Sequence, residues 1–362
     1  MAPSIRAVAG ALAFVVLAAL PGTAGPDDRR RARLGVRYLV TQQAEDGSIT
    51  AFSTVGSTAD AVMGFVAARR APRAIDEAVE FLRARGPEVP LGQKAKIVMA
   101  LVAAGEDPRD VEGRDLIAEI EATQTAEGQY ATTPGDFAGE VTSHILAMLA
   151  LEAAGAVPDP QADRWLIAAQ CADGGWQFDE PATDADDEHC FTGSAEDFAR
   201  SDSNTTSYAV QALIATEPAI DPAVDPFTFF PRARDPIKRG WIYDPASRCN
   251  AETRPPDCFL TDANSTALVI QAYVAADKPI PRGGGRALAA LKYAAPCGRL
   301  AGAFAFTWEE RGGELRRSPA RDEARGPSVV GATIAAIPGL LRKPFPIAHA
   351  PVTKPPPFAE CR

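Results

Sequence analysis

The sequence has few of the side chains that build metal centres. Its three histidines, His144, His189 and His349, lie far apart, none of its six cysteines forms a CxxC pair, and no HExxH string occurs. Zinc sites depend on such closely spaced ligands. We therefore expect no zinc site, and we expect Cys190, next to His189, to form a disulfide.

Long apolar runs are also scarce. One run, from Ala7 to Leu20, follows Arg6 and precedes the small residues Gly22-Thr23-Ala24. It is too short to span a bilayer and is typical of an export signal. We therefore expect a signal peptide over residues 1–24, a secreted or periplasmic mature chain that starts near Gly25, and no membrane insertion.

The chain is short of positive charge. It has 37 Lys and Arg against 47 Asp and Glu, and its formal net charge is −10. An acidic surface repels the phosphates of nucleic acids and of anionic lipids. We therefore expect no nucleic-acid partner.

The six cysteines are an even number in a chain expected to be exported, which favours disulfides over free thiols. Six cysteines allow fifteen pairings. Pairing of nearest neighbours would close two loops and attach the C-terminal tail. We favour that set: Cys171 with Cys190, Cys249 with Cys258, and Cys297 with Cys361.

A short string recurs at the start of several apolar segments. Ser57-Thr58-Ala59 and Ser265-Thr266-Ala267 begin segments that align without a gap. Aligned on the threonine, six copies have their anchors at Thr58, Lys94, Thr142, Thr206, Thr266 and Val329. The intervals of 36 to 64 residues each leave room for two helices and their connections. The sequence therefore predicts six helical hairpins.

The anchored segments are apolar nearly all round, as buried inner helices are, whereas the segments between them are amphipathic. The amphipathic segments are 34–43, 74–83, 115–124, 163–170 and 286–293. Six inner and six outer helices predict an all-α fold, an α6/α6 toroid over residues 25–345, followed by a Pro-rich C-terminal tail at 346–362. The long loops would then gather at one mouth, around the N-termini of the inner helices.

A second repeated element follows several outer segments. It reads Gln43 to Ile49, Gln124 to Tyr130, and Gln170-Cys171-Ala172-Asp173-Gly174-Gly175-Trp176, with a trace at Gly240-Trp241. The third copy resembles the QxxDGGW repeat of the squalene cyclase and prenyltransferase superfamily, which includes terpene cyclases, prenyltransferase β subunits, the transcobalamin-like vitamin B12 carriers and complement thioester domains. The resemblance implies the toroid fold rather than an activity. In these loops we expect glycine to permit a tight turn, and Gln and Trp to pack neighbouring hairpins.

The resemblance also implies where a catalytic acid would lie. Class II terpene cyclases carry a DxDD motif before an inner helix, and its middle aspartate donates a proton. The matching positions here read Asp202-Ser203-Asn204-Thr205 and Asp262-Ala263-Asn264-Ser265, so asparagine replaces that acid twice. An amide cannot act as a general acid. No GCGEQ-like thioester string occurs either.

A literal DxDD occurs at Asp184 to Asp187, in a strongly acidic loop between Cys171 and Cys190. A solvated loop lacks the dry cavity that such a proton donor needs, so a charged surface loop is the favoured interpretation. Two alternatives stay open. One is calcium binding by Asp184, Asp186, Asp187 and Glu188, because hard cations prefer carboxylate oxygens, and the other is catalysis by Asp186.

The mouth formed by the inner-helix N-termini is the predicted ligand site, because each N-terminus carries a partial positive charge and polar caps. Its predicted rim consists of Glu140, Thr142, Asp202, Asn204, Thr205, Asp262, Asn264 and Ser265, with flat apolar contacts from Tyr130, Trp176 and Trp241.

Three functions follow as hypotheses. The first is a secreted, non-catalytic binding protein without a cofactor, which holds a small molecule or peptide at this mouth and is similar to the barrel of the B12 carriers. The second is an enzyme like terpene cyclases or prenyltransferases that acts on an isoprenoid. The third is an extracellular structural or protein-interaction ring.

Overall fold

The computed structural model describes residues 23–85, 89–131, 141–179, 190, 198–218, 221–249, 258–311, 314–318 and 327–352. Residues 1–22 of the predicted signal peptide lie outside these ranges. Within them, no helix is long and apolar enough to cross a membrane.

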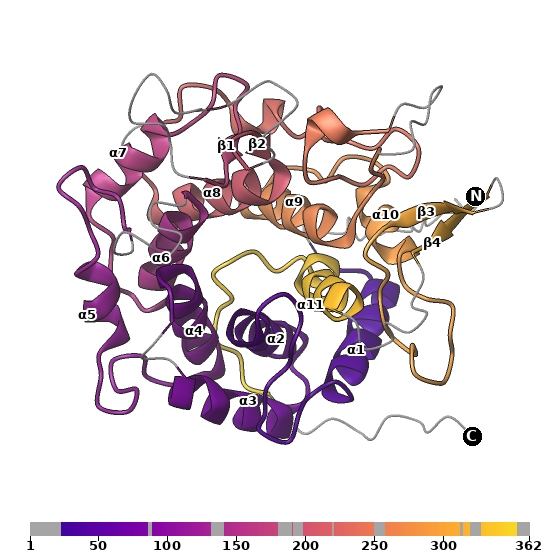
Figure 1. Ribbon diagram of the computed structural model, residues 1–362, viewed down its shortest axis with the longest axis horizontal. Coiled ribbons are helices and arrows are strands. Elements are labelled where there is room, and N and C mark those ends of the chain that lie inside the picture. Colours follow the sequence, from indigo (N-terminus) through magenta and orange to yellow (C-terminus); the bar gives the residue numbers. More distant parts are fainter. Residues whose placement is uncertain are drawn as a thin grey trace, which may run out of the picture.

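Six inner helices form a ring (Figure 1). They are α2 (Thr54–Ala68), α4 (Leu91–Ala104), α6 (Val141–Ala153), α8 (Ser203–Thr216), α9 (Ala263–Ala275) and α11 (Pro327–Leu341). Each helix packs against the next in this order, and α11 packs against α2. The first and last inner helices are therefore neighbours.

Five outer helices surround this ring: α1 (Pro26–Val40), α3 (Pro72–Arg85), α5 (Leu116–Glu121), α7 (Pro160–Ala168) and α10 (Gly284–Ala290). The prediction of six outer helices is wrong at one place. Between α8 and α9 the structure has the 3-10 turn η2 (Pro226–Thr228) instead of an outer α-helix within 221–249. Prolines 222, 226, 231 and 236 punctuate this stretch and remove the backbone donors that an α-helix needs.

Short strands and turns complete the described chain. Strand β1 (Trp176–Gln177) pairs antiparallel with β2 (Ser201–Asp202), and β3 (Trp308–Arg311) pairs with β4 (Glu314–Arg317). A second 3-10 turn, η3 (Pro245–Ser247), lies between α8 and α9. These elements belong to the connections between helices, so the layers of the fold are helical throughout.

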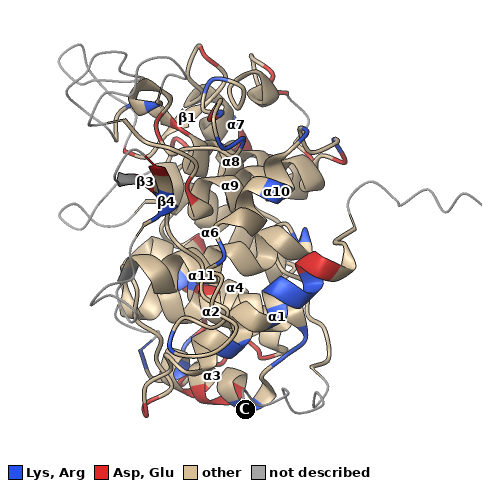
Figure 2. Cartoon of the chain, turned by 90° about the vertical axis from the view of Figure 1, so that its right-hand side faces the viewer, with Lys and Arg blue, Asp and Glu red and all other residues tan. Residues whose placement is uncertain are grey.

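Burial follows the charge pattern of the sequence. The inner helices are buried over most of their lengths, whereas α1 and α3 bury only one face. Figure 2 marks the charged residues along α1 and α3. Side chains cap several N-termini, as when Ser53 accepts from the Gly56 amide at α2. Such caps satisfy amide donors that the helix itself leaves unpaired.

The loops with the pattern Gln-x-x-Asp/Glu-Gly connect outer helices to inner ones through one recurring geometry. The side-chain amides of Gln43, Gln124 and Gln170 donate to the carbonyl oxygens of Gly47, Gly128 and Gly174, at 2.9, 3.3 and 3.1 Å. All three glycines have positive φ angles. A Cβ at Gly47 would lie 2.1 Å from the carbonyl oxygen of Glu77 in α3. Glycine therefore lets this loop approach the next outer helix, as Gly128 does with Gln161 of α7.

The residue two positions after each of these positive-φ residues donates its amide to a side chain of the following inner helix. Ile49 and Trp176, after Gly47 and Gly174, donate to the hydroxyls of Thr58 and Thr206, and Trp241, after Arg239, donates to the hydroxyl of Thr266. Tyr130 donates instead to His144 Nδ1, and Phe304, after Gly302, donates to Thr333. Loop 298–304 is thus a further copy that sequence analysis missed.

These hydrogen bonds correct two of the sequence anchors. The equivalent positions in α6 and α11 are His144 and Thr333, so the predicted anchors Thr142 and Val329 are wrong by two and four residues. The sequence alignment matched threonine with threonine, but in α6 a histidine accepts the hydrogen bond that threonine accepts in the other helices. Thr142 lies on another face of its helix and contacts Thr205.

The segment after α11 returns through the space that the inner helices enclose (Figure 1). Phe345 and Ile347 are 8% and 4% exposed, and His349 Nδ1 lies 3.0 Å from the carbonyl oxygen of Ala103 at the end of α4. The predicted boundary between fold and tail, at residue 345, therefore divides a segment that packs as one piece.

Candidate functional site

A cavity of about 390 Å³ lies inside the ring of inner helices. This volume is at the lower end of the range for small-molecule pockets, about 300–1,000 Å³. Eleven apolar or aromatic residues and eight polar or charged ones form its walls: Phe52, Ser57, Asp60, Lys96, Thr142, Phe178, Phe198, Asn204, Thr205, Tyr208, Tyr243, Asn264, Leu268, Gln271, Gly331, Ile334, Ala335, Pro338 and Phe345.

Helical periodicity explains which residues face inward. The anchor side chains, such as Thr58 and Thr206, point outward to the loops. Two residues further along, Asp60 and Tyr208 line the cavity. A step of two residues turns the side chain by about 200° around a helix of 3.6 residues per turn, so outward anchors imply inward cavity residues.

One ion pair lies on the cavity wall between α2 and α4. Lys96 Nζ is 2.7 Å from Asp60 Oδ2, and the two side chains are 22% and 23% exposed. Burial alone would lower the pKa of Lys96, but the Asp60 carboxylate outweighs burial and raises it. Lys96 therefore stays a cation and is committed to Asp60. The pKa of Tyr208 is also raised, to about 12, mainly by burial. The charge of Lys96 opposes this increase in pKa, and the charge of Asp60 adds to it.

Two amides face the cavity from the N-terminal ends of α8 and α9. Asn204 and Asn264 both line it, and each has a buried side-chain oxygen without a hydrogen-bond partner among the described residues. A buried acceptor left unpaired costs about 1–3 kcal/mol. Both oxygens are therefore suited to accept hydrogen bonds from a bound molecule.

Asp202 and Asp262 lie two residues before these asparagines and cap the same helices. Asp202 Oδ1 accepts from the amides of Asn204 and Thr205, both at 2.8 Å, and Asp262 Oδ1 accepts from the Ser265 amide at 2.7 Å. Burial raises the pKa of each carboxyl to about 7, against the opposing effect of these amides. The caps hold the asparagines in position at the cavity wall.

Tyr243 completes this end of the cavity. Its hydroxyl is close enough to the Asp202 carboxyl for each to affect the pKa of the other, although Tyr243 Oη and Asp202 Oδ2 do not meet in hydrogen-bond geometry. Burial and the Asp202 charge raise the pKa of Tyr243, so it stays a neutral phenol.

Three solved structures resemble the chain over most of its length. The type II terpene cyclase MstE from Scytonema has a TM-score of 0.56 and 14% identity, with 87% of this chain and 97% of that one covered. An unsaturated glucuronyl hydrolase specific for heparin has a TM-score of 0.57 and 11% identity, with 88% and 97% covered. The α-1,6-mannanase GH76A of Salegentibacter sp. HEL1_6 has a TM-score of 0.52 and 10% identity, with 87% and 100% covered.

The chain is an αα-toroid. Identities this low establish the shared fold alone, and toroids with different activities share it. No protein-family model and no curated protein matches the chain. Its function must therefore be inferred from its own cavity.

The toroid brings several of the predicted rim residues together. Thr142, Asn204, Thr205 and Asn264 line the cavity, and the hydroxyls of Thr142 and Thr205 are 3.0 Å apart. Asp202, Asp262 and Ser265 are buried at the same end, where the two aspartates act as helix caps. Glu140 lies outside the described residues.

The aromatic part of the predicted rim is wrong. Trp176, Trp241 and Tyr130 are fully or almost fully buried, and none of them lines the cavity. The indole nitrogens of Trp176 and Trp241 donate to the carbonyl oxygens of Leu166 and Phe230, on the outer side of the ring. Because their loops meet the outward face of each inner helix, these rings pack between inner and outer layers.

The disulfides follow the prediction where the structure describes them. Cys171 bonds to Cys190 and Cys249 bonds to Cys258. Cys297 is also disulfide-bonded, and its predicted partner Cys361 lies outside the described residues. The acidic residues Asp184, Asp186, Asp187 and Glu188 lie outside them as well. Within the described ranges, no group of three His, Cys, Asp or Glu side chains could hold a metal ion.

Sequence analysis missed Asp60, Lys96, Tyr208 and Phe345 as cavity residues. A signal was present for the ion pair, because α2 and α4 each carry one inward charge in an otherwise apolar stretch, two residues after the anchors Thr58 and Lys94. Lys94 itself points outward and pairs with Glu119 of α5.

Proposed function

We propose that the toroid is a binding protein that holds a small, mainly apolar molecule with a hydroxyl or amino group in its central cavity. The observation that carries this proposal is the pair of unpartnered side-chain oxygens on Asn204 and Asn264 in a wall that is otherwise largely apolar. Only a hydrogen-bond donor satisfies these oxygens.

The size of the ligand follows from the volume. At about 30 Å³ for each water-sized group, a cavity of 390 Å³ accommodates about a dozen non-hydrogen atoms. Phe52, Phe178 and Phe198 line the cavity and suit an apolar body. A carboxylate head group would fit less well, because it donates no hydrogen bond and Lys96 is already neutralised by Asp60.

Binding can be tested with straight-chain 1-alkanols and with the matching carboxylates, by calorimetry and thermal unfolding. We expect the alkanols to bind and to raise the midpoint of unfolding, since a ligand at 100 times its Kd stabilises the folded state by about 2.7 kcal/mol. The carboxylates should bind more weakly. Absence of binding by every alkanol would contradict the proposal.

Matched variants connect binding to the two amides. Asn204→Ala and Asn264→Ala should each weaken alkanol binding about tenfold, which corresponds to about 1.4 kcal/mol. Ser207→Ala is the control, because Ser207 lies on α8 but bonds to the carbonyl oxygen of Ser203 and does not line the cavity. Equal affinities for all three variants and the wild type would exclude the two amides as ligand contacts.

Acid catalysis on an isoprenoid is the second candidate. One observation favours it: Asp202 is a buried carboxyl with a pKa raised by burial to about 7, next to a phenol that lines the cavity. Product formation from a polyprenyl substrate that is lost in Asp202→Asn, while alkanol binding is retained, would establish catalysis instead of binding alone.

A further inference from the structure

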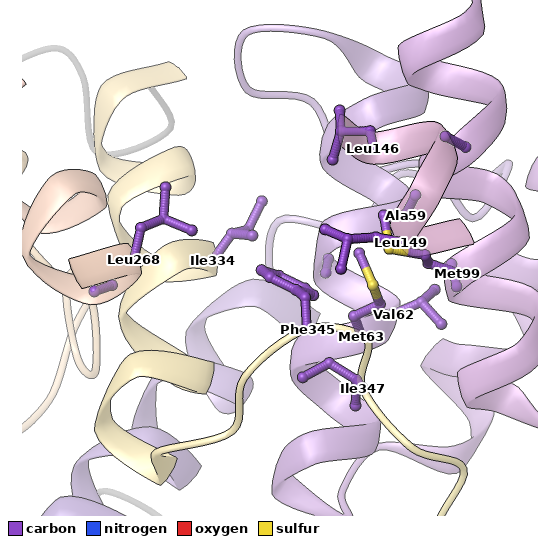
Figure 3. Close-up of a cluster of buried hydrophobic side chains, with 14 of the residues drawn as sticks. Ala59, Val62, Met63, Met99, Leu146, Leu149, Leu268, Ile334, Phe345 and Ile347 are labelled. Carbon is purple, nitrogen blue, oxygen red and sulfur yellow. The ribbon is translucent and has the colours of Figure 1, made fainter. Parts of the chain in front are cut away.

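The C-terminal segment bonds to Gln211 of α8 and Gln271 of α9, about two helical turns after Asn204 and Asn264, and its Phe345 lines the cavity. In Figure 3, Phe345 lies between Leu268 and Ile334 on one side and Met63 and Leu149 on the other, and Ile347 lies below Met63. Phe345 is itself a wall of the cavity, and its ring centroid is 5.8 Å from that of Tyr208. Ile347 is also buried, but it does not line the cavity.

Two buried glutamines hold this segment in place. Gln211 Oε1 accepts from the Phe345 amide at 2.8 Å, and Gln271 Nε2 donates to the carbonyl oxygen of Lys343 at 2.7 Å. Gln211 is oriented in turn by its own hydrogen bond to the carbonyl oxygen of Ser207.

Gln211 and Gln271 occupy the same register in α8 and α9, five residues after Thr206 and Thr266. Both are 1% exposed. Without the C-terminal segment, each would leave a polar group unpaired in an apolar core, at a cost of about 1–3 kcal/mol. The segment is therefore a fixed part of the ring, and the position of Phe345 is determined by both neighbouring helices.

We propose that Phe345 sets the maximum length of the apolar part of the ligand. This inference rests on the proposed function: the polar group of the ligand binds at Asn204 and Asn264, and its apolar end meets the Phe345 ring. A longer ligand has no space beyond the ring, because the helices and the anchored backbone surround it. Phe345 is thus a specificity-determining residue, supplied by the far end of the chain.

The test is a chain-length profile. The affinities of 1-alkanols with 6 to about 16 carbons are measured for the wild type, Phe345→Ala, Phe345→Leu and Ile347→Ala. Phe345→Ala removes the six ring carbons of the side chain and extends the cavity. The alkanol with the highest affinity should therefore be about four to six carbons longer in this variant than in the wild type. Phe345→Leu should give a smaller lengthening.

Ile347→Ala is the matched control, because it truncates a buried side chain of the same segment without altering the cavity wall. Its profile should match that of the wild type even where its stability falls. Phe345→Leu keeps the test usable if Phe345→Ala does not fold. Unchanged length preference in the Phe345 variants, with binding intact, would overturn this inference alone, whereas a wild type that binds no alkanol would overturn the proposed function as well.

Discussion

Lys96 Nζ lies 2.7 Å from Asp60 Oδ2 and joins α4 to α2 at the wall of the central cavity. Removing one partner from a buried pair leaves a charge that water does not fully solvate, at a cost of about 3–5 kcal/mol. The two side chains are 22% and 23% exposed, so water solvates the remaining charge in part and the cost falls at the lower end of this range. We therefore expect Asp60→Asn to lower the free energy of unfolding by about 3 kcal/mol. Denaturant unfolding measures the change.

The matched control for this prediction is the double variant Asp60→Asn with Lys96→Met, which removes both charges. It should recover most of the lost stability, because an apolar replacement of a buried pair is often neutral. A double variant as unstable as Asp60→Asn would show that the charge of Lys96 is not the cause.

Asp202 makes stability depend on pH in an unusual direction. Its pKa is raised by burial from 3.8 to about 7, so the folded state holds a proton that the unfolded state releases. The contribution of Asp202 is therefore most favourable below about pH 4 and declines as the pH rises to 7. The stability of the wild type relative to Asp202→Asn should fall by about 3 kcal/mol from pH 4.5 to 7, at about 1.4 kcal/mol per pH unit.

Asparagine keeps an oxygen to cap α8, so the comparison isolates the proton rather than the cap. Unfolding curves at the two pH values give the difference. A difference between wild type and Asp202→Asn that does not vary with pH would contradict the elevated pKa.

His144 makes the protein less stable as the pH falls, the opposite of the effect of Asp202. Burial lowers its pKa from 6.5 to about 3, and its Nδ1 accepts from the Tyr130 amide, so the folded state requires the neutral ring. The contribution of His144 to the free energy of unfolding is complete above pH 6.5 and is lost as the pH falls toward 3. By pH 4.5 the loss amounts to about 3 kcal/mol.

The variant His144→Thr separates this loss from that of other groups, because threonine takes the same position in α2, α8 and α9. It should be less stable than the wild type at pH 8, since the contact of the ring with Trp165 is lost, yet lose less stability between pH 8 and 4.5. An equal loss in both proteins would show that His144 does not titrate on unfolding.

Gly302 shows how closely the layers approach. Its φ angle is +96°, and a Cβ there would lie 2.0 Å from the carbonyl oxygen of Leu34 in α1. Gly302→Ala should therefore lower the free energy of unfolding by about 3 kcal/mol or more, as measured by thermal or denaturant unfolding. Gly113→Ala is the control, because Gly113 also has a positive φ but open space around it, and it should cost only about 1 kcal/mol. Equal costs would mean that backbone conformation, rather than close approach, selects glycine.

The arrangement of inner and outer helices could be predicted because apolar composition and the Thr and QxxDG strings repeat in phase. The same approach failed where one physical role passes to another residue type. His144 accepts the loop amide as threonine does elsewhere, and the positive φ before Trp241 belongs to Arg239 instead of glycine. Residue type alone does not reveal such substitutions.

The cavity was predictable only in part. Asn204 and Asn264 could be identified because they follow helix caps, whose chemistry is local. Phe345 could not, because the proline-rich composition around it is typical of an exposed tail. Its burial depends on two hydrogen bonds, from the Phe345 amide to Gln211 and from Gln271 to the Lys343 carbonyl oxygen. These pairs are 134 and 72 residues apart in the sequence and come close only when the ring forms.

The contact of α11 with α2 also affects how the protein is made. Residues 327–352 supply both the last inner helix and the segment that fills the ring, so the inward faces of the earlier helices have no complete partner until these residues have been synthesised. A nascent chain halted before α11 exposes an apolar surface that aggregation and proteolysis can exploit. Folding of this core therefore has to wait for residues 327–352.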